Sequence, residues 1–510
     1  MSTIKKMLLV AVVCMALLGL AACTTKNETK NDTPATNTPT TAAAADPTAT
    51  PTPDVPDRDL KGLEVVISNW WEKADYNVPQ NEADESFWNW QNSQMKKYNY
   101  KLTLKGEGKK RDGTEVPELA SGYGWSDEAQ NNLLAITEDK PLGSIVTFDY
   151  RFIGALMDSE EMLFCDISKL SEFNFQDKKW NQGVIKLMTV GDGIYGWNVG
   201  NEPRTGIFFN KDKMNQILGE GAGEKPYDLQ AKGEWTWDNF KALAQSLTTK
   251  NADGTTATYG FASQQSVFFE MAWVSNGHGI TSKDASGRFT SNLTSSDIQG
   301  DMEWAYSFYD DGIMRRQNEE EAAAGQWNYF EFMFQRQEAI MLAYDEYKAS
   351  EFVEVKDGVR AYDFDYGFVC FPKGPKVDNY VCVARENILA IPACTDNKKN
   401  LADIAFVYNI YTDKTPDQVD DPNSWKLQYE KLFRDKRAVD ETLDYMINKT
   451  TPVVEASYIV PGLWDNSNGV IQVSMLYSID SPDKRPAQTL EEVSSRVQEC
   501  INDFNAKRVK

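Results

Sequence analysis

Aromatic rings stand beside carboxylates or amides at several points of this sequence, most of them directly after a short apolar run. A flat ring packs against apolar C–H faces of a ligand, while acids and amides hydrogen-bond to a rim of hydroxyl groups. This combination suits a polyhydroxylated molecule such as a sugar, held in a largely preformed cleft. The candidate ligand-binding residues are Trp70, Trp71, Glu72, Phe148, Asp149, Tyr150, Tyr195, Trp197, Asn198, Tyr344 and Asp345.

Several other chemistries fit the sequence poorly. The chain has 76 Asp and Glu against 53 Lys and Arg, a formal net charge of -23, so nucleic-acid phosphates are not an expected partner. His278 is the only histidine, which leaves no basis for a multi-histidine zinc site or a Ser–His–Asp triad. We expect it to be a loop residue bound by backbone groups. Asp253-Gly254 predicts a turn rather than a calcium loop, and the Glu run at 319–321 predicts a solvated helix start, so no metal and no cofactor are expected.

Hydrophobic periodicity predicts the elements that position the candidate residues. Apolar runs at residues 63–67, 100–104 and 144–148 predict strands, and residues 84–98 and 126–136 predict helices between them. This alternation indicates an α/β fold with mainly parallel sheets covered on both faces. In such sheets ligands bind beyond the carboxyl ends of the strands, which is where most of the candidate residues stand.

A later region repeats the same organisation. A chain of 510 residues is too long for one compact core, so two or more folding units are expected. Thr236 is expected to cap a helix. Further helices are predicted at residues 298–309, 401–411 and 490–504, and further strands at 339–343, 367–371 and 387–391.

The first residues have the pattern of an export signal. Lysines precede an apolar stretch at residues 7–20, which is too short to span a bilayer comfortably. It ends in Leu20-Ala21-Ala22-Cys23, which resembles the bacterial lipobox, in which the cysteine is acylated, for example with palmitate. We expect a signal peptide at residues 1–22, a lipid on Cys23 and, over residues 23–58, a disordered Thr/Pro/Ala tether. The protein would then be anchored to the extracytoplasmic face of the cell membrane.

Five cysteines remain once Cys14 and Cys23 are set aside. An odd number argues against a dedicated disulfide framework, and buried free thiols are favoured. Cys370 and Cys382 flank a Pro–Gly turn, so a pair between these two stays open.

From about residue 61 to 510 the order of short motifs resembles the family 1 extracellular solute-binding proteins of the maltodextrin-binding type. The matching motifs are Gly193-Ile-Tyr195-Gly196 with Gly206 to Asp212 ("YG…YNKD"), Pro226 with Thr236 to Phe240 ("P…TWdeF"), Asp253-Gly254 to Phe261, Phe334 to Met341 ("F…GkaAM") and Gly367 to Pro375 ("G…fPkGp"). Each motif is weak alone, but the order and spacing are specific. Gln337 stands where the family has Gly, so the turn before that strand must take a conformation that a non-Gly residue tolerates.

This resemblance implies the two-lobe fold of class II periplasmic binding proteins, with discontinuous lobes joined by a hinge that closes on ligand. By analogy, lobe 1 is residues 61–175 plus 376–420, and lobe 2 is residues 176–375 plus 421–510. The resemblance also implies a monomeric binding protein without enzymatic activity. Such a protein captures a carbohydrate and passes it to the permease subunits of an ABC importer.

In this family, residues 148–150 and Tyr344 fall at positions that commonly touch sugar. Trp464 lines up with another stacking position, and Trp273 lies next to a segment that lines the cleft. An aromatic residue after a strand can equally be a lid on the core. We expect ligand contact most strongly at Trp71, Asp149, Tyr344 and Trp464, and we expect Trp464→Ala to weaken sugar binding with little effect on folding. Tryptophans within predicted helices are expected in the core: Trp88, Trp90, Trp235, Trp237 and Trp304.

Two alternatives stay open. The same fold could bind a non-sugar solute such as a polyamine, a peptide or an oxoanion, because aromatic rings and acids also suit a cation. A secreted glycoside hydrolase is the other. It needs two carboxylates ~5 Å or ~6.5–9.5 Å apart across a cleft, and no order of motifs here resembles such an enzyme.

Overall fold

The computed structural model describes residues 58–508 apart from 81, 125–127, 159–160, 201, 354, 357–358, 361, 386, 417–422, 424, 451 and 466–467. The predicted signal peptide (1–22), Cys23 and the tether up to residue 57 lie outside the described residues, as do the predicted helix-starting residues Ser126 and Asp127. Among the helices of the described part, none has the length and apolar character needed to cross a membrane.

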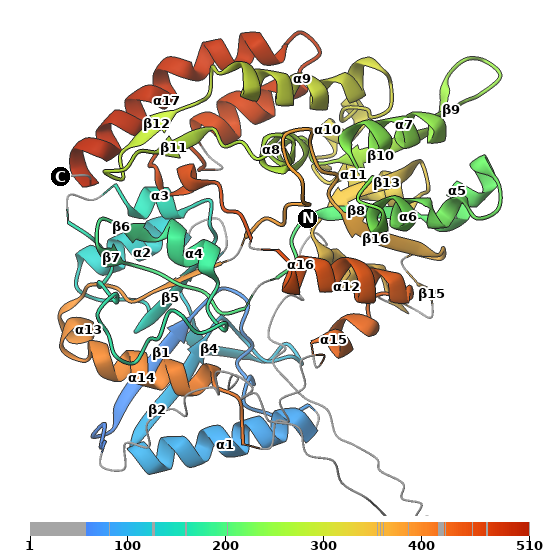
Figure 1. Cartoon of the computed structure of the whole chain (residues 1–510). Coiled ribbons are helices and arrows are strands. Elements are labelled where there is room, and N and C mark those ends of the chain that lie inside the picture. The colour runs from blue at the N-terminus through green and yellow to red at the C-terminus, as the bar shows by residue number, and fades with distance from the viewer. Residues whose placement is uncertain are drawn as a thin grey trace, which may run out of the picture.

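The first sheet has the strand order β17-β5-β1-β2. Its strands are β1 (Leu63–Ser68), β2 (Tyr100–Lys105), β5 (Ile145–Phe148) and β17 (Ile388–Ala390). β1 pairs in parallel with β2 and with β5, and β17 pairs antiparallel with β5. Because β1 and β5 are parallel neighbours, the residues that follow Ser68 and Phe148 lie at one edge of the sheet. α1 (Glu82–Tyr98) and α14 (Leu401–Thr412) pack beside this sheet (Figure 1).

The second sheet has the strand order β16-β8-β13-β10-β9. Its strands are β8 (Gly206–Asn210), β9 (Thr249–Lys250), β10 (Thr256–Ser263), β13 (Ala339–Tyr344) and β16 (Tyr366–Cys370). Only β10 and β13 pair in parallel, since β8 runs opposite to both of its neighbours and β9 opposite to β10. The α/β class is confirmed, but the prediction of mainly parallel strands is wrong for this sheet.

Helices cover both sheets. The remaining α-helices are α2 (Glu128–Thr137), α3 (Ile153–Leu156), α4 (Gln182–Leu187), α5 (Lys211–Leu218), α6 (Lys225–Ala231), α7 (Trp237–Leu247), α8 (Gln265–Ser275), α9 (Ser296–Asp310), α10 (Glu319–Ala323), α11 (Tyr329–Gln335), α12 (Ala349–Phe352), α13 (Thr395–Lys399), α15 (Lys426–Glu430), α16 (Asp444–Asn448) and α17 (Pro486–Arg508). 3₁₀ and π segments are η1 (Ala222–Glu224), η2 (Glu346–Lys348), η3 (Ala438–Leu443), η4 (Ala456–Ile459), η5 (Val470–Tyr477) and η6 (Ser478–Asp480). Two-stranded pairs are β3 (Glu107–Lys109) with β4 (Glu115–Ala120), β6 (Thr189–Val190) with β7 (Gly193–Ile194), β11 (Thr281–Lys283) with β12 (Phe289–Ser291), and β14 (Val355–Lys356) with β15 (Val359–Arg360).

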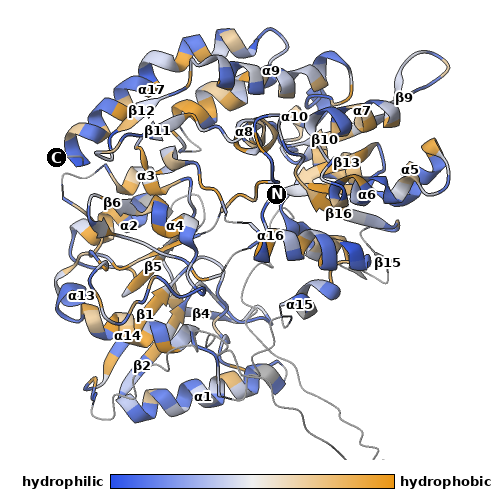
Figure 2. Cartoon of the chain, viewed as in Figure 1, coloured by the Kyte–Doolittle hydropathy of each residue, from blue (hydrophilic) through white to orange (hydrophobic). Residues whose placement is uncertain are grey.

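Local sequence explains why these elements form. The Thr236 side chain accepts a hydrogen bond from the Asn239 amide and so caps α7, as predicted. Phe240 and Leu243 of α7 are buried at helical spacing. Figure 2 shows hydrophobic strands at the centre of each half, with hydrophilic residues along the outer sides of α1 and α17.

The two sheets take their strands from interleaved parts of the chain. The first uses residues 63–148 and 388–390, and the second uses residues 206–370. Between them three segments lie side by side, since Val383 forms backbone bridges with both Arg204 and Val453. The fold is thus the discontinuous arrangement that was expected, while the exact lobe boundaries stay a prediction.

Several single-residue expectations can be compared with the structure. Gln337 has φ +60°, the left-handed conformation that the missing glycine would favour. Cys370 and Cys382 are buried free thiols. The expectation for His278 is wrong: its ring Nδ1 lies 2.6 Å from a carboxylate oxygen of Asp301 rather than on the backbone. Among the tryptophans expected in the core, Trp88, Trp235 and Trp237 are buried as expected, while Trp90 and Trp304 are only half-buried.

Candidate ligand-binding site

A tight turn after β1 presents two tryptophans at the edge of the first sheet. The Asn69 side-chain oxygen accepts hydrogen bonds from the amides of Trp71 (3.0 Å) and Glu72 (2.7 Å), which fixes the turn. The rings of Trp70 and Trp71 meet edge to face, 4.6 Å apart, and both are half-buried. The turn packs so closely on Gly106 that a Cβ there would lie 2.2 Å from the Glu72 carbonyl oxygen.

The neighbouring strand β5 ends in Asp149 and Tyr150. Asp149 accepts two hydrogen bonds from the Arg151 guanidinium, both at 2.8 Å, so its carboxylate is bound by an adjacent cation. Burial raises the pKa of the Tyr150 hydroxyl to about 12. We call Trp70, Trp71 and Tyr150 the strand-end rings.

Tyr150 meets a second pair of rings from the C-terminal part of the chain. Its ring lies edge to face on Tyr458 of η4 at 4.6 Å, and Tyr458 in turn lies 4.5 Å from Trp464. η4 packs against α3, where a Cβ on Gly154 would lie 2.9 Å from the Val460 carbonyl oxygen. Residues more than 300 positions apart in sequence therefore form one aromatic group.

Charged residues surround this aromatic group. Arg385 donates to Glu270 of α8 at 2.7 Å and to Thr205 at 2.8 Å, and the Tyr458 hydroxyl donates to Glu270 at 2.5 Å. The Thr205 hydroxyl donates to Asp345, which follows β13, at 2.5 Å. We call Thr205, Glu270, Asp345, Arg385 and Tyr458 the arginine network.

The arginine network holds strained backbone as well as charge. Thr205 has φ +55°, a left-handed conformation that β-branched residues rarely adopt, and it is fully buried. Such strain persists only where the surroundings fix the residue, and it is concentrated at functional sites. The two hydrogen bonds of the Thr205 hydroxyl provide that fixation.

A buried acid lies behind Trp464. The Trp464 indole donates to the Ser457 hydroxyl at 2.8 Å, and that hydroxyl donates to Glu455 at 2.9 Å. Glu455 also accepts the Ile280 amide at 3.2 Å. Burial raises the pKa of the Glu455 carboxyl to about 7.

At the edge of the second sheet, Tyr344 ends β13. Its half-buried ring stacks on Phe330 at 5.9 Å, and the Lys348 ammonium lies 4.9 Å from its centroid. Lys348 is paired with Glu331 at 2.8 Å. Asp345, which follows Tyr344 at the end of β13, therefore connects the second sheet to the arginine network through its hydrogen bond with Thr205.

The predicted site residues consequently fall into two sets. The structure links Tyr150, Trp464 and Asp345 through Tyr458 and the arginine network, with Asp149 and Tyr344 as their chain neighbours. The half-buried Trp70, Trp71 and Glu72 follow β1, the parallel neighbour of β5. Phe148, Trp197 and Trp273 are instead completely buried core residues. Asn198 donates to the Asn387 carbonyl as part of a structural turn, and Tyr195 lies near Asp166 and Arg508, away from the aromatic group.

Sequence reasoning missed five members of this site, among them Thr205, which has no local signal in the sequence. Glu270 stands as a lone charge within the apolar run Phe268 to Val274, and that pattern was an available signal for a buried charge. Arg385 directly follows the apolar run Val381 to Ala384 and is next to Glu386, so its signal was weaker. Arg151 directly follows Tyr150. Tyr458 carried no local signal, because only the fold brings it to Tyr150.

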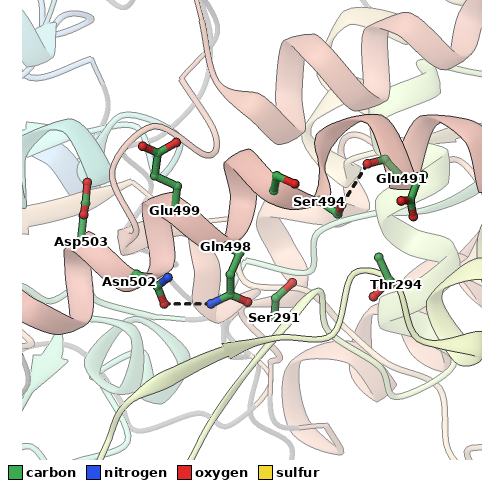
Figure 3. Close-up of a pocket in the computed structure, with 9 residues that line it drawn as sticks. Ser291, Thr294, Glu491, Ser494, Gln498, Glu499, Asn502 and Asp503 are labelled. Atoms are coloured by element: carbon green, nitrogen blue, oxygen red, sulfur yellow. Dashed lines mark hydrogen bonds between the residues drawn. The ribbon is translucent and has the colours of Figure 1, made fainter.

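Other kinds of site find little support. Within the described ranges, no group of three His, Cys, Asp or Glu is arranged to hold a metal ion. A surface hollow of about 830 Å³ lies over α17 and the end of β12, far from the strand ends (Figure 3). Its lining is polar or acidic and has no aromatic ring: Ser291, Thr294, Glu491, Ser494, Ser495, Gln498, Glu499, Asn502 and Asp503.

Solved structures share the fold at low sequence identity. A cyclo/maltodextrin-binding protein in complex with maltotetraose is 13% identical, with a TM-score of 0.53 over 86% of this chain and 98% of that chain. The cyclic alpha-maltosyl-1,6-maltose binding protein of Arthrobacter globiformis is 12% identical, with a TM-score of 0.54 over 88% and 98%. UgpB of Mycobacterium tuberculosis, in complex with glycerophosphocholine, is 14% identical, with a TM-score of 0.52 over 86% and 98%. At these identities the likeness establishes the fold alone.

The sequence itself carries the family assignment. No curated protein matches the chain. The family model described as "Bacterial extracellular solute-binding protein" matches residues 110–414, which is more than half of the chain and includes β5, β8, β10, β13 and β16. The chain therefore belongs to the bacterial extracellular solute-binding protein family.

Proposed function

We propose that this protein captures an oligosaccharide outside the cell and delivers it to the permease subunits of an ABC importer. The observation that carries this proposal is that half-buried aromatic rings stand beside hydrogen-bonding acids directly after strands of both sheets. The strand-end rings and Tyr344 offer flat apolar faces, and Glu72 and Asp345 offer acceptors for hydroxyl groups. Family membership supports a binding protein, and two solved relatives by fold carry maltotetraose or bind a cyclic maltose derivative.

The proposed protein is a binding protein without catalysis. Two acids nearest the aromatic group are engaged by cations, Asp149 by Arg151 and Glu270 by Arg385. A glycosidase needs one carboxyl that can protonate the leaving group and a second that attacks or activates water. The Asp149 and Glu270 carboxylates are both held by their cations, and Glu455 behind Trp464 is buried and accepts hydrogen bonds from the Ser457 hydroxyl and the Ile280 amide.

The proposed location is the extracytoplasmic face of the cell membrane. Cleavage after Ala22 and acylation of Cys23 would anchor the chain, and residues 24–57 would serve as a tether long enough for the binding unit to search for ligand and importer. We propose that the protein works as a monomer.

A ligand panel tests the proposal. The protein without its first 23 residues is heated alone and with maltose, maltotriose, maltotetraose, spermidine or glycerophosphocholine. A bound ligand raises the melting temperature with concentration by mass action. We expect the longer maltooligosaccharides to raise it and to be recovered intact.

The other outcomes distinguish sugar binding from non-sugar binding and from hydrolysis. If only spermidine or glycerophosphocholine raises the melting temperature, the protein binds a non-sugar solute. Recovery of shortened sugars would replace the binding role with a hydrolase. No shift with any sugar, including a wider glycan set, would overturn the carbohydrate assignment.

A further inference from the structure

Trp327 is the one aromatic side chain among the large hydrophobic residues that the described part of the chain leaves exposed. Its exposed fraction is 57%. The others are aliphatic: Val78, Leu134, Leu218 and Val453. Single exposed aliphatic residues are ordinary on protein surfaces. An exposed indole differs, because it leaves a large flat face available to a ligand.

The turn that carries Trp327 is tightly held. Gly325 has φ +64°, and the Trp327 amide donates back to the Gly325 carbonyl at 3.0 Å. The Gln326 carbonyl accepts the Gln317 side chain at 2.8 Å, and the Gln326 amide donates to Glu321 at 2.8 Å. Glu321 is in turn held by Arg315 at 2.6 Å. A ring on such a turn loses little conformational freedom when it binds.

The position of this turn relates Trp327 to the candidate site. α11 precedes β13 and packs along it, and Phe330 near the start of α11 stacks on Tyr344 at the end of the strand. The helix therefore runs back along the strand, and its first residues lie at the strand's carboxyl end (Figure 1). Trp327 lies 6.5 Å from Phe330, and Phe330 lies 5.9 Å from Tyr344, measured between ring centroids.

We propose that Trp327 is an outer subsite at which one sugar unit of an oligosaccharide stacks while other units occupy the site at Tyr344 and Asp345. This inference rests on the proposed function. The buried Phe330 joins the two positions without being available to ligand itself. A ligand short enough to stay at the inner site would not contact Trp327, since the buried Phe330 lies between the two positions, so the subsite makes affinity depend on chain length.

The test compares ligands of different length on matched surface variants. Calorimetric titrations with maltose and with maltooligosaccharides of four to seven units are run on the wild type, Trp327→Ala, Trp327→Phe and Leu134→Ala. Leu134 is 58% exposed on α2 and serves as the control for loss of an exposed apolar side chain. We expect Trp327→Ala to weaken the longer ligands about tenfold, the equivalent of one aromatic contact, and to leave maltose unchanged. Trp327→Phe should retain part of the difference, and Leu134→Ala should match the wild type.

Each remaining outcome is decisive. Equal weakening at every length, or none at any length, overturns the outer subsite while leaving the proposed function intact. If the wild type binds maltose and the longer maltooligosaccharides with equal affinity, the outer subsite is overturned in the same way. If Trp327→Ala binds every sugar normally but supports less uptake in cells, the exposed ring belongs to a protein contact instead. Absence of binding to any sugar by the wild type removes the proposed function itself.

Discussion

The strand-end rings and the arginine network meet where Tyr150 contacts Tyr458, but they are stabilised differently. Trp70, Trp71 and Tyr150 are half-buried and are positioned largely by ring contacts and by the Asn69 turn. In the arginine network, Arg385 and Glu270 are almost completely buried and are held by hydrogen bonds between charged groups. The first region has surface left to offer a ligand. In the second, Arg385 and Glu270 are committed to each other within the protein, and the half-buried Asp345 is the network member that stays partly open to a ligand. We infer that the rings bind and the network holds the two sheet edges in register.

This difference predicts separate consequences for substitution. Changes in the network should appear mainly in the free energy of unfolding, because a buried charge that loses its partner is costly. Changes in the rings should appear mainly in ligand affinity, because a half-buried ring contributes less to the core. A network variant that changes mainly ligand affinity, or a ring variant that changes mainly the free energy of unfolding, would contradict this difference between the two regions.

The largest expected effect is on Arg385→Ala. It leaves Glu270 buried without its cation, and we expect a loss of about 3–5 kcal/mol in the free energy of unfolding. Urea denaturation measures this loss. The matched control replaces both Arg385 and Glu270 with Met. No buried charge is then left without a partner, so the double variant should lose less free energy of unfolding than the single variant. A single variant within about 1 kcal/mol of the wild type would remove the distinction between the two regions.

Trp464→Ala should also act chiefly on folding, at about 3 kcal/mol. Trp464 is 2% exposed and its indole donates to Ser457, so the structure favours an effect on folding over the little effect that the sequence suggested. Trp327→Ala is the matched control, because it removes the same side chain from an exposed turn and should cost less than about 1 kcal/mol. Equal losses in the two tryptophan variants would contradict the burial argument.

The buried acid behind Trp464 predicts how stability depends on pH. The folded-state pKa of Glu455 is raised to about 7 from an ordinary value of 4.5, so the folded protein binds this proton more tightly than the unfolded chain does. Its contribution to stability is fully present below pH 4.5 and is lost as pH rises through about 7, by an amount on the order of 3 kcal/mol. Glu455→Gln should flatten the fall in melting temperature over this window. His278, the only histidine, lies 2.6 Å from the Asp301 carboxylate, so His278→Gln is the control, and a fall that disappears there instead would reassign the effect.

The sequence allowed most of the fold to be predicted, and the reason is local. The strands at residues 63–68 and 145–148 are short apolar runs, and Thr236 caps its helix through a hydrogen bond within four residues. Pairing direction is not local. β8 is an apolar strand like the others, and nothing in its residues shows that it runs opposite to both neighbours.

The candidate site was predictable only where one strand end determines it. Asp149 and Tyr150 follow β5 directly, so their placement at the sheet edge could be foreseen. Trp197 has the same local pattern of ring beside amide, yet it is completely buried, because its ring packs on Phe173 and on Tyr408 of a distant helix. Tyr458 shows the converse, since it reaches Tyr150 only through the packing of η4 on α3. Whether a ring after a strand is open or covered depends on the segment that returns over it.

The smallest expected effect sharpens the comparison most directly. Trp71→Ala removes a half-buried ring from the turn after β1, and we expect it to weaken the binding of the best maltooligosaccharide by about 1–2 kcal/mol, or roughly 5- to 30-fold. Because the turn itself is fixed by the Asn69 side chain and by the close approach of Gly106, the free energy of unfolding should change by less than about 1 kcal/mol. Calorimetric titration and urea denaturation of the same preparation separate the two quantities, and Trp71→Phe should recover much of the affinity. Normal affinity combined with a large loss of stability would place Trp71 with the buried residues and would leave ligand contact to Tyr150 and Tyr344.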